Sequence, residues 1–75
     1  MPIDYKEQKE PEYYQGNKYG YSARKVVEDF NLSYNVGTAT SYLLRAGKKE
    51  GNAAEQDIQK AINHLHFAIH LNPIQ

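Results

Sequence analysis

The sequence predicts a small all-α protein, in which an extended N-terminal arm precedes a bundle of about three helices. Its 75 residues leave room for one domain. From residue 21 onward, apolar residues recur at helical spacing in three segments separated by polar or glycine-containing breaks. Residues 1–20 instead contain two prolines, two glycines and seven charged residues, without a regular apolar period. We therefore assign 1–20 to an extended or flexible arm and 21–75 to the helical domain.

The first helix is expected at 22–31. Ser22 is a suitable N-cap, and Val26, Val27 and Phe30 form an apolar stripe along one side of the segment. The two β-branched valines lower its helix propensity, so a strand is the alternative for this segment.

The second helix is expected at 33–46. Ser33 can cap its start, and Gly47 suits the left-handed position that follows a helix end. Gly37 falls inside the helix, where glycine costs about 1 kcal/mol relative to alanine. Such a glycine indicates either a close helix contact or a ligand near the backbone. The apolar positions of this helix are Leu32, Val36, Ala39, Thr40 and Leu43.

The third helix, the longest, is expected at 52–71. Asn52 is its predicted N-cap, and Glu55 three residues later completes an arrangement similar to a capping box. Pro73 is expected to stop the helix. Its apolar stripe consists of Ile58, Ala61, Ile62, Leu65, Ala68 and Ile69.

Composition excludes several classes of protein. Nine basic and nine acidic residues give a formal charge of zero, so binding to nucleic acid is not expected. The absence of cysteine excludes a disulfide scaffold and a thiolate site. Apolar runs of two or three residues are too short to span a membrane, and no secretion signal is recognisable, so we expect the cytosol.

No metal site and no resident cofactor is predicted. His66 and His70 are spaced i, i+4, but no H-E-x-x-H motif and no cysteine completes a ligand set. No arrangement of a nucleophile, a base and an acid is recognisable, so no catalytic residue is assigned. A helical core of about 55 residues without disulfide or metal is marginally stable alone, and we expect a homo-oligomer for that reason.

The most suggestive segment contains Arg45, Lys48 and Lys49, which lie around Gly47 at a helix end. These cations could hold the oxygens of a phosphate group. The alternative is that they interact favourably with the helix macrodipole while the glycine caps the helix.

Three tyrosines could stack on a base or sugar ring, and they are Tyr19, Tyr21 and Tyr42. The alternative is that they close a small core while one end of each ring remains wet.

The chain resembles a small bacteriophage domain family of otherwise unknown function. The residues that carry the resemblance are 18–20, 26–30, 32–37, 42–49 and 57–62, and 42–49 is the most specific part. The family has an asparagine directly after the glycine of the second helix and a lysine directly before its tyrosine. This chain has Thr38 and Ser41 at those positions.

By resemblance, a similar domain is also carried by a larger phage protein, a deoxynucleoside monophosphate kinase without a Walker motif. The resemblance implies a nucleotide-related role in the cytoplasm of an infected bacterium. Phosphoryl transfer would require two nucleotides and Mg²⁺, and a chain of this length would need several subunits to build such a site. We therefore do not expect the chain to be an enzyme on its own, and Mg²⁺ is implied only for a kinase.

These observations lead to two hypotheses. In the first, the protein binds a nucleotide, either for nucleotide metabolism or to sequester a signalling nucleotide. Asn35 and Thr38 then belong to the site together with the three cations and three tyrosines named above. The phosphate ligands are then Arg45, Lys48 and Lys49, and the stacking residues are Tyr42, Tyr19 and Tyr21. In the second, the chain is an interaction module that binds a host or phage protein through its Tyr-rich arm and exposed helix faces, without nucleotide.

Overall fold

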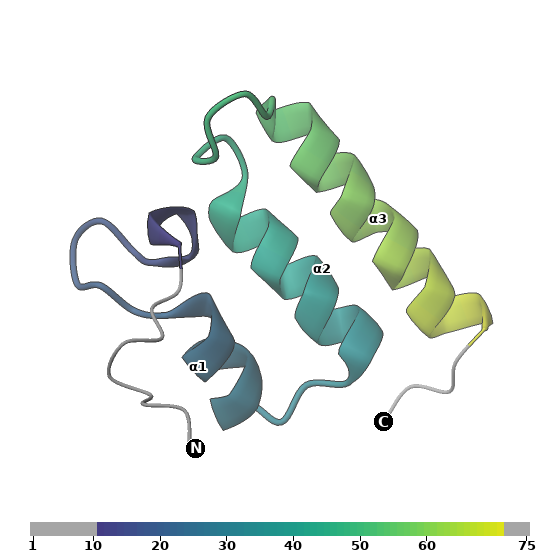
Figure 1. The fold of residues 1–75 in the computed structure, drawn as a ribbon. Coiled ribbons are helices and arrows are strands. Elements are labelled where there is room, and N and C mark those ends of the chain that lie inside the picture. The colour runs from purple at the N-terminus through teal and green to yellow at the C-terminus, as the bar shows by residue number, and fades with distance from the viewer. Residues whose placement is uncertain (1–10, 72–75) are drawn as a thin grey trace, which may run out of the picture.

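A computed structural model describes residues 11–71 and confirms the all-α prediction. Within these residues the chain forms a 3-10 turn η2 (Glu12–Tyr14) and three α-helices: α1 (Ala23–Asp29), α2 (Tyr34–Arg45) and α3 (Ala54–His70). The helices lie side by side, with α2 between α1 and α3, and α2 and α3 form a hairpin (Figure 1). None of the helices in the described part of the chain is long and apolar enough to cross a membrane.

The helix α1 begins where the sequence predicts. The Ser22 hydroxyl oxygen accepts a hydrogen bond from the backbone N–H of Lys25 at 3.3 Å, which satisfies a free donor at the helix start. The helix ends two residues earlier than expected, at Asp29, and Asn31 follows it with a φ of 54°. Asparagine tolerates this left-handed conformation better than most residues, so it turns the chain toward α2.

Gly37 marks the contact between α1 and α2. A Cβ atom at this position would lie 2.7 Å from Cγ1 of Val27, which is closer than van der Waals contact. The glycine is buried and allows the two backbones to approach. Of the two readings of this residue, the structure therefore shows the close helix contact.

The start of α3 differs from the expectation. Ala53, not Asn52, occupies the N-cap position, and no side chain caps the helix there. The Asn52 amide instead donates a hydrogen bond to Oδ1 of Asp57 at 3.4 Å. The predicted cap at Asn52 is therefore wrong by one residue, and the Asn52 side chain instead contacts a residue in the first turns of the same helix. Gly47, in contrast, has the predicted left-handed conformation, with a φ of 78°.

Residues 11–21, most of which fall in the expected arm, are folded onto the helical domain. The backbone N–H of Gly16 donates to the carbonyl of Tyr21 at 2.9 Å, and Gln15 pairs with Ser22 in an isolated antiparallel bridge. The turn η2 contacts α2. Residues 1–10 of the expected arm, and the predicted stop at Pro73, lie outside the described residues.

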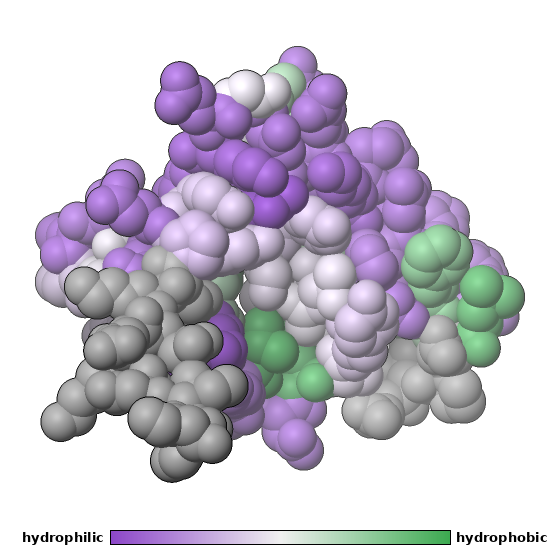
Figure 2. All heavy atoms as spheres, in the orientation of Figure 1, coloured by the Kyte–Doolittle hydropathy of each residue, from purple (hydrophilic) through white to green (hydrophobic). Residues whose placement is uncertain are grey.

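Small side chains occupy the centre of the domain. Within residues 11–71 the buried apolar side chains are all alanines: Ala23, Ala39, Ala61 and Ala68. The larger apolar residues of the predicted stripe on α3 are partly exposed. On the face shown in Figure 2, most residues are hydrophilic, and hydrophobic ones gather at its lower centre and right edge.

Candidate functional site

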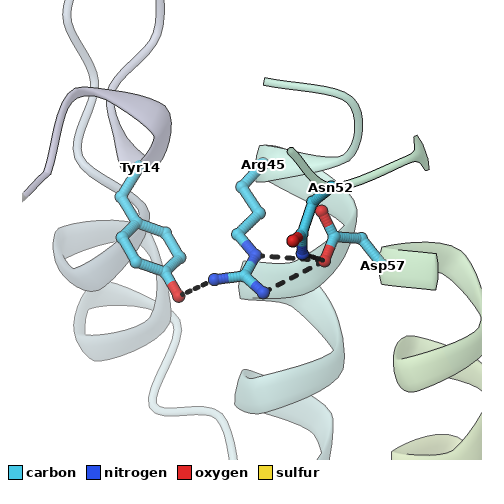
Figure 3. Close-up of polar contacts among 4 residues, drawn as sticks. All are labelled: Tyr14, Arg45, Asn52 and Asp57. Carbon is cyan, nitrogen blue, oxygen red and sulfur yellow. Dashed lines mark hydrogen bonds and ion pairs between the residues drawn. The ribbon is translucent and has the colours of Figure 1, made fainter. Parts of the chain in front are cut away.

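An ion pair closes the hairpin of α2 and α3. Arg45 is the last residue of α2 and Asp57 lies in the first turns of α3, so the hairpin connection brings them together. Both Nε and Nη2 of Arg45 donate to Oδ1 of Asp57, at 3.2 and 3.0 Å (Figure 3). The side chains are 7% and 0% exposed, respectively. Each charge also lies at the helix end whose dipole favours it.

Tyr14 and Asn52 complete the surroundings of this pair. Arg45 Nη1 donates to the Tyr14 hydroxyl oxygen at 2.8 Å, and the Asn52 amide donates to Asp57, as Figure 3 shows. Desolvation lowers the pKa of Arg45, but the hydrogen bonds to Asp57 and Tyr14 and the attraction of the carboxylate outweigh it. The net effect raises the pKa of Arg45 above its ordinary value. Arg45 is therefore a permanent buried cation whose charge is compensated within the chain.

This arrangement changes the assignment of Arg45. The guanidinium that the sequence offers as a phosphate ligand is buried in the hairpin, and it donates to a carboxylate and a phenol of the same chain. Lys48 and Lys49 lie in the loop after α2, and the backbone N–H of Lys48 donates to the Arg45 carbonyl at 2.8 Å. Of the three predicted phosphate ligands, the two lysines are thus the accessible ones.

Cations and tyrosine rings alternate along one side of the hairpin. Arg45 Cζ lies 4.7 Å from the ring centroid of Tyr42 and 5.6 Å from that of Tyr13. The Lys60 ammonium lies 5.5 Å from the Tyr42 ring, and the Lys49 ammonium lies 5.5 Å from the Tyr13 ring. We call this series the cation–ring row, and its members are Lys60, Tyr42, Arg45, Tyr13 and Lys49.

The charge of the cation–ring row is positive. Asp57 compensates Arg45, whereas neither Lys49 nor Lys60 makes an ion pair with any residue from 11 to 71. Each ammonium instead lies within 6 Å of a ring, where cation–π attraction favours this position. Two uncompensated cations beside two partly exposed rings could receive an anionic ligand that carries a ring of its own.

His64 continues this side of the hairpin beyond Tyr42. Its Nδ1 lies 2.9 Å from Oδ1 of Asn35, and its ring is stacked at 5.9 Å on Tyr42. Tyr34 and Phe67 meet the same ring edge-on, at 6.0 and 5.7 Å. Asn35 and Tyr42, both predicted ligand-binding residues, are thus joined through a histidine that the sequence did not single out for the site.

The remaining predicted residues lie elsewhere. Tyr19 and Tyr21 face each other at 5.9 Å between ring centroids, and the Lys18 ammonium lies 5.3 Å from the Tyr19 ring. Within residues 11–71, no hydrogen bond, ion pair or ring contact joins this pair to the cation–ring row. Thr38 lines a groove of about 340 Å³ between α1 and α2, where Tyr14 and Ser41 also contribute to the wall.

Sequence reasoning missed Tyr13, Tyr14, Asp57 and Lys60. One signal was present for Asp57, because it occupies the position four residues before Ala61 in the buried stripe of α3. A carboxylate in such a stripe implies a buried partner of opposite charge. No comparable signal marks Tyr13 and Tyr14, which precede any regular element with apolar periodicity.

Comparison with known proteins returns no match: no protein-family model, no curated protein and no solved structure is similar to this chain. The resemblance to the phage domain family therefore stays a prediction.

Proposed function

We propose that the protein binds a nucleoside phosphate at the cation–ring row. The observation that carries the proposal is the placement of Lys49 and Lys60, two cations without an ion-pair partner among residues 11–71, beside the rings of Tyr13 and Tyr42. A nucleotide combines a flat ring with an anion, and this row offers a matching group for each.

Arg45 has a different role in this proposal from the one its position in the sequence suggested. It contacts both Tyr13 and Tyr42, and Asp57 and Tyr14 fix its guanidinium in turn. It therefore holds the two rings in place and adds no uncompensated charge. Lys49 and Lys60 lie at the two ends of the row, so the phosphate is held at one end, either by Lys49 with Lys48 of the same loop or by Lys60. The base stacks on the neighbouring tyrosine ring.

The resemblance to the phage domain family supports the biological setting of the proposal. We place the protein in the cytoplasm of a phage-infected bacterium, where it takes part in nucleotide metabolism or sequesters a signalling nucleotide. The two settings require the same recognition of a ring and a phosphate, so the binding experiment precedes any distinction between them.

The experiment is a titration of ¹⁵N-labelled protein with dTMP and dGMP up to about 5 mM, followed by NMR. We expect shifts of backbone amides at residues 42–49 and 57–64. Thymidine and inorganic phosphate, titrated separately, are expected to bind more weakly than dTMP, because each retains half of the recognised chemistry. Binding is expected to weaken as salt rises, since exposed cations hold the phosphate.

Variants assign the binding to the row. Lys49→Ala/Lys60→Ala is expected to weaken binding of dTMP roughly tenfold, because two exposed cations are lost. The matched control is Lys18→Ala/Lys25→Ala, which removes the same charge and also one lysine–ring contact, outside the row. Equal affinity of the two double variants, or no shift with any nucleotide, would contradict the proposal.

A second candidate function is an interaction module, and exposed aromatic residues favour it. Tyr19, Tyr21, Phe30 and Tyr34 are 71–78% exposed. Aromatic residues are enriched at the cores of protein interfaces relative to the rest of the surface. The test compares the wild-type chain with Tyr19→Ser/Tyr21→Ser as bait for extracts of infected bacteria. A specific protein that is lost with the variant, together with unchanged dTMP binding, would favour this function over the first.

A further inference from the structure

The helix α3 carries an apolar stripe beside the residues that it buries against α2. The stripe consists of Ile58, Ile62, Leu65 and Ile69, and these side chains are 40–65% exposed. Their spacing of four, three and four residues places them along one line of the helix. The same spacing defines the seam of helices that pack against each other in bundles.

The position of the stripe follows from its neighbours. Ala61 is buried against α2, and successive residues of an α-helix are turned by about 100°. Lys60 and Ile62 therefore lie on opposite sides of the contact with α2. Because Lys60 reaches the Tyr42 ring on the side of the cation–ring row, Ile62 and the stripe lie on the other side.

Leu43 of α2 extends the stripe. It follows Tyr42, whose ring is part of the row, and it is 50% exposed. Thr40 lies one turn earlier, and its hydroxyl donates to the carbonyl of Val36 at 2.8 Å, so it presents little unsatisfied polarity. The hairpin of α2 and α3 thus has one side with cations and rings and another side with aliphatic residues. We call this second side the aliphatic face and define it as Leu43, Ile58, Ile62, Leu65 and Ile69.

We infer that the aliphatic face binds the same face of a second copy of the chain, which makes the protein a homodimer with a four-helix core. Within residues 11–71, the apolar side chains buried in a single copy are all alanines. The five aliphatic residues leave on the order of 450 Å² of apolar surface exposed, which is within the roughly 300–600 Å² of the largest apolar patch on a typical monomer, a patch that is often functional. A stable interface buries roughly 800 Å² per partner, so this face supplies about half of one and the residues at its margin must supply the rest.

The charges around the aliphatic face suit a second copy. The outer edge of the stripe on α3 consists of Gln59, Asn63, His66 and His70, with Glu55 at the helix start. This edge contains no lysine or arginine, so two-fold packing brings no row of like charges together. A two-fold axis between two such hairpins makes the face complementary to itself, because each aliphatic side chain meets the same kind of side chain. The cation–ring row remains accessible on the opposite side of each hairpin.

The test measures mass in solution by sedimentation equilibrium. The wild type is expected at twice the chain mass of 8.6 kDa. Ile62→Glu is expected to sediment as a single chain with unchanged helix content by circular dichroism, since its position is exposed in the single copy. The matched control is Phe67→Glu, on the same helix at the same exposure but off the aliphatic face. It is expected to remain a dimer.

A second measurement tests the inference even if Ile62→Glu fails to fold. The chain contains no cysteine, so single cysteines at Ile58, Ile62, Leu65 or Ile69 report proximity directly. Oxidation is expected to link two copies at one or more of these positions and at none when the cysteine replaces Asn63 or Phe67. A wild type that sediments as a single chain at about 100 µM overturns the inference. So does a folded Ile62→Glu variant of wild-type mass, or cross-linking that is equal on and off the face.

Discussion

The buried ion pair between Arg45 and Asp57 is expected to be the most sensitive point of the fold. Asp57→Asn preserves the shape of the side chain but leaves the Arg45 cation, whose side chain is 7% exposed, without a counter-charge. Removing one partner of a buried pair costs about 3–5 kcal/mol. A chain of this length has roughly 4–11 kcal/mol of stability in total, so this variant is expected to lose a large part of it.

A double-mutant cycle isolates the interaction of the two charges. Arg45→Met leaves the Asp57 carboxylate with the donor Asn52 at 3.4 Å, and it is expected to be similarly damaging. The double variant Arg45→Met/Asp57→Asn buries no charge, so it is expected to be more stable than either single variant. The coupling free energy is then about 2–4 kcal/mol, measured by urea unfolding followed by circular dichroism.

The chain contains a matched control for this cycle. Arg24 and Glu28 form an ion pair at 2.8 Å, but their side chains are 55% and 62% exposed. The cycle of Arg24→Met and Glu28→Gln is expected to give a coupling of about 0.3–0.5 kcal/mol, because water screens this pair. The reasoning is refuted if the effects at Arg45 and Asp57 are additive to within about 0.5 kcal/mol, or if the exposed pair couples as strongly.

Three further predictions concern stability and are measured by the same urea unfolding. Gly37→Ala is expected to destabilise the protein by about 1–3 kcal/mol, because the new Cβ meets Val27 and this outweighs the better helix propensity of alanine. Val27→Ala in the same chain is expected to restore part of the lost stability. Ala53→Asp supplies the missing N-cap of α3 and is expected to stabilise by about 1 kcal/mol; a loss of stability would contradict the observed helix start. Tyr14→Phe removes the hydrogen bond from Arg45 and is expected to cost about 1 kcal/mol, whereas an effect near zero would mean that this bond is not formed in solution.

Helix identity and most helix ends were predictable from the sequence, because they depend on local physics. Ser22 caps α1 through a hydrogen bond to a residue three positions later, and Gly47 takes a left-handed conformation two residues after α2 ends. The apolar period predicted the type of each element, but for the segment of Val26 and Val27 it left a strand open, and only the structure shows a helix there. The predicted cap of α3 was one residue too early. The pattern of residues at the helix start does not show that the Asn52 side chain contacts the buried Asp57 instead of capping the backbone.

The candidate site was predictable in part. The sequence located Lys48, Lys49 and Tyr42, which share one short segment with Arg45. It did not show that Arg45 is buried, because the partner that neutralises it lies twelve residues further along the chain.

The sequence by itself determined an all-α chain, its break points and a surplus of aliphatic residues for so short a protein. The tertiary structure decided which residues of each helix are buried. Periodicity marks an apolar side of a helix without saying which part of it meets a neighbour, so alanines fill the contacts here and the larger aliphatic residues of α3 lie beside them. The tertiary structure also decided that Arg45 neutralises Asp57, because the pairing of two buried charges depends on where the hairpin brings the helix ends together.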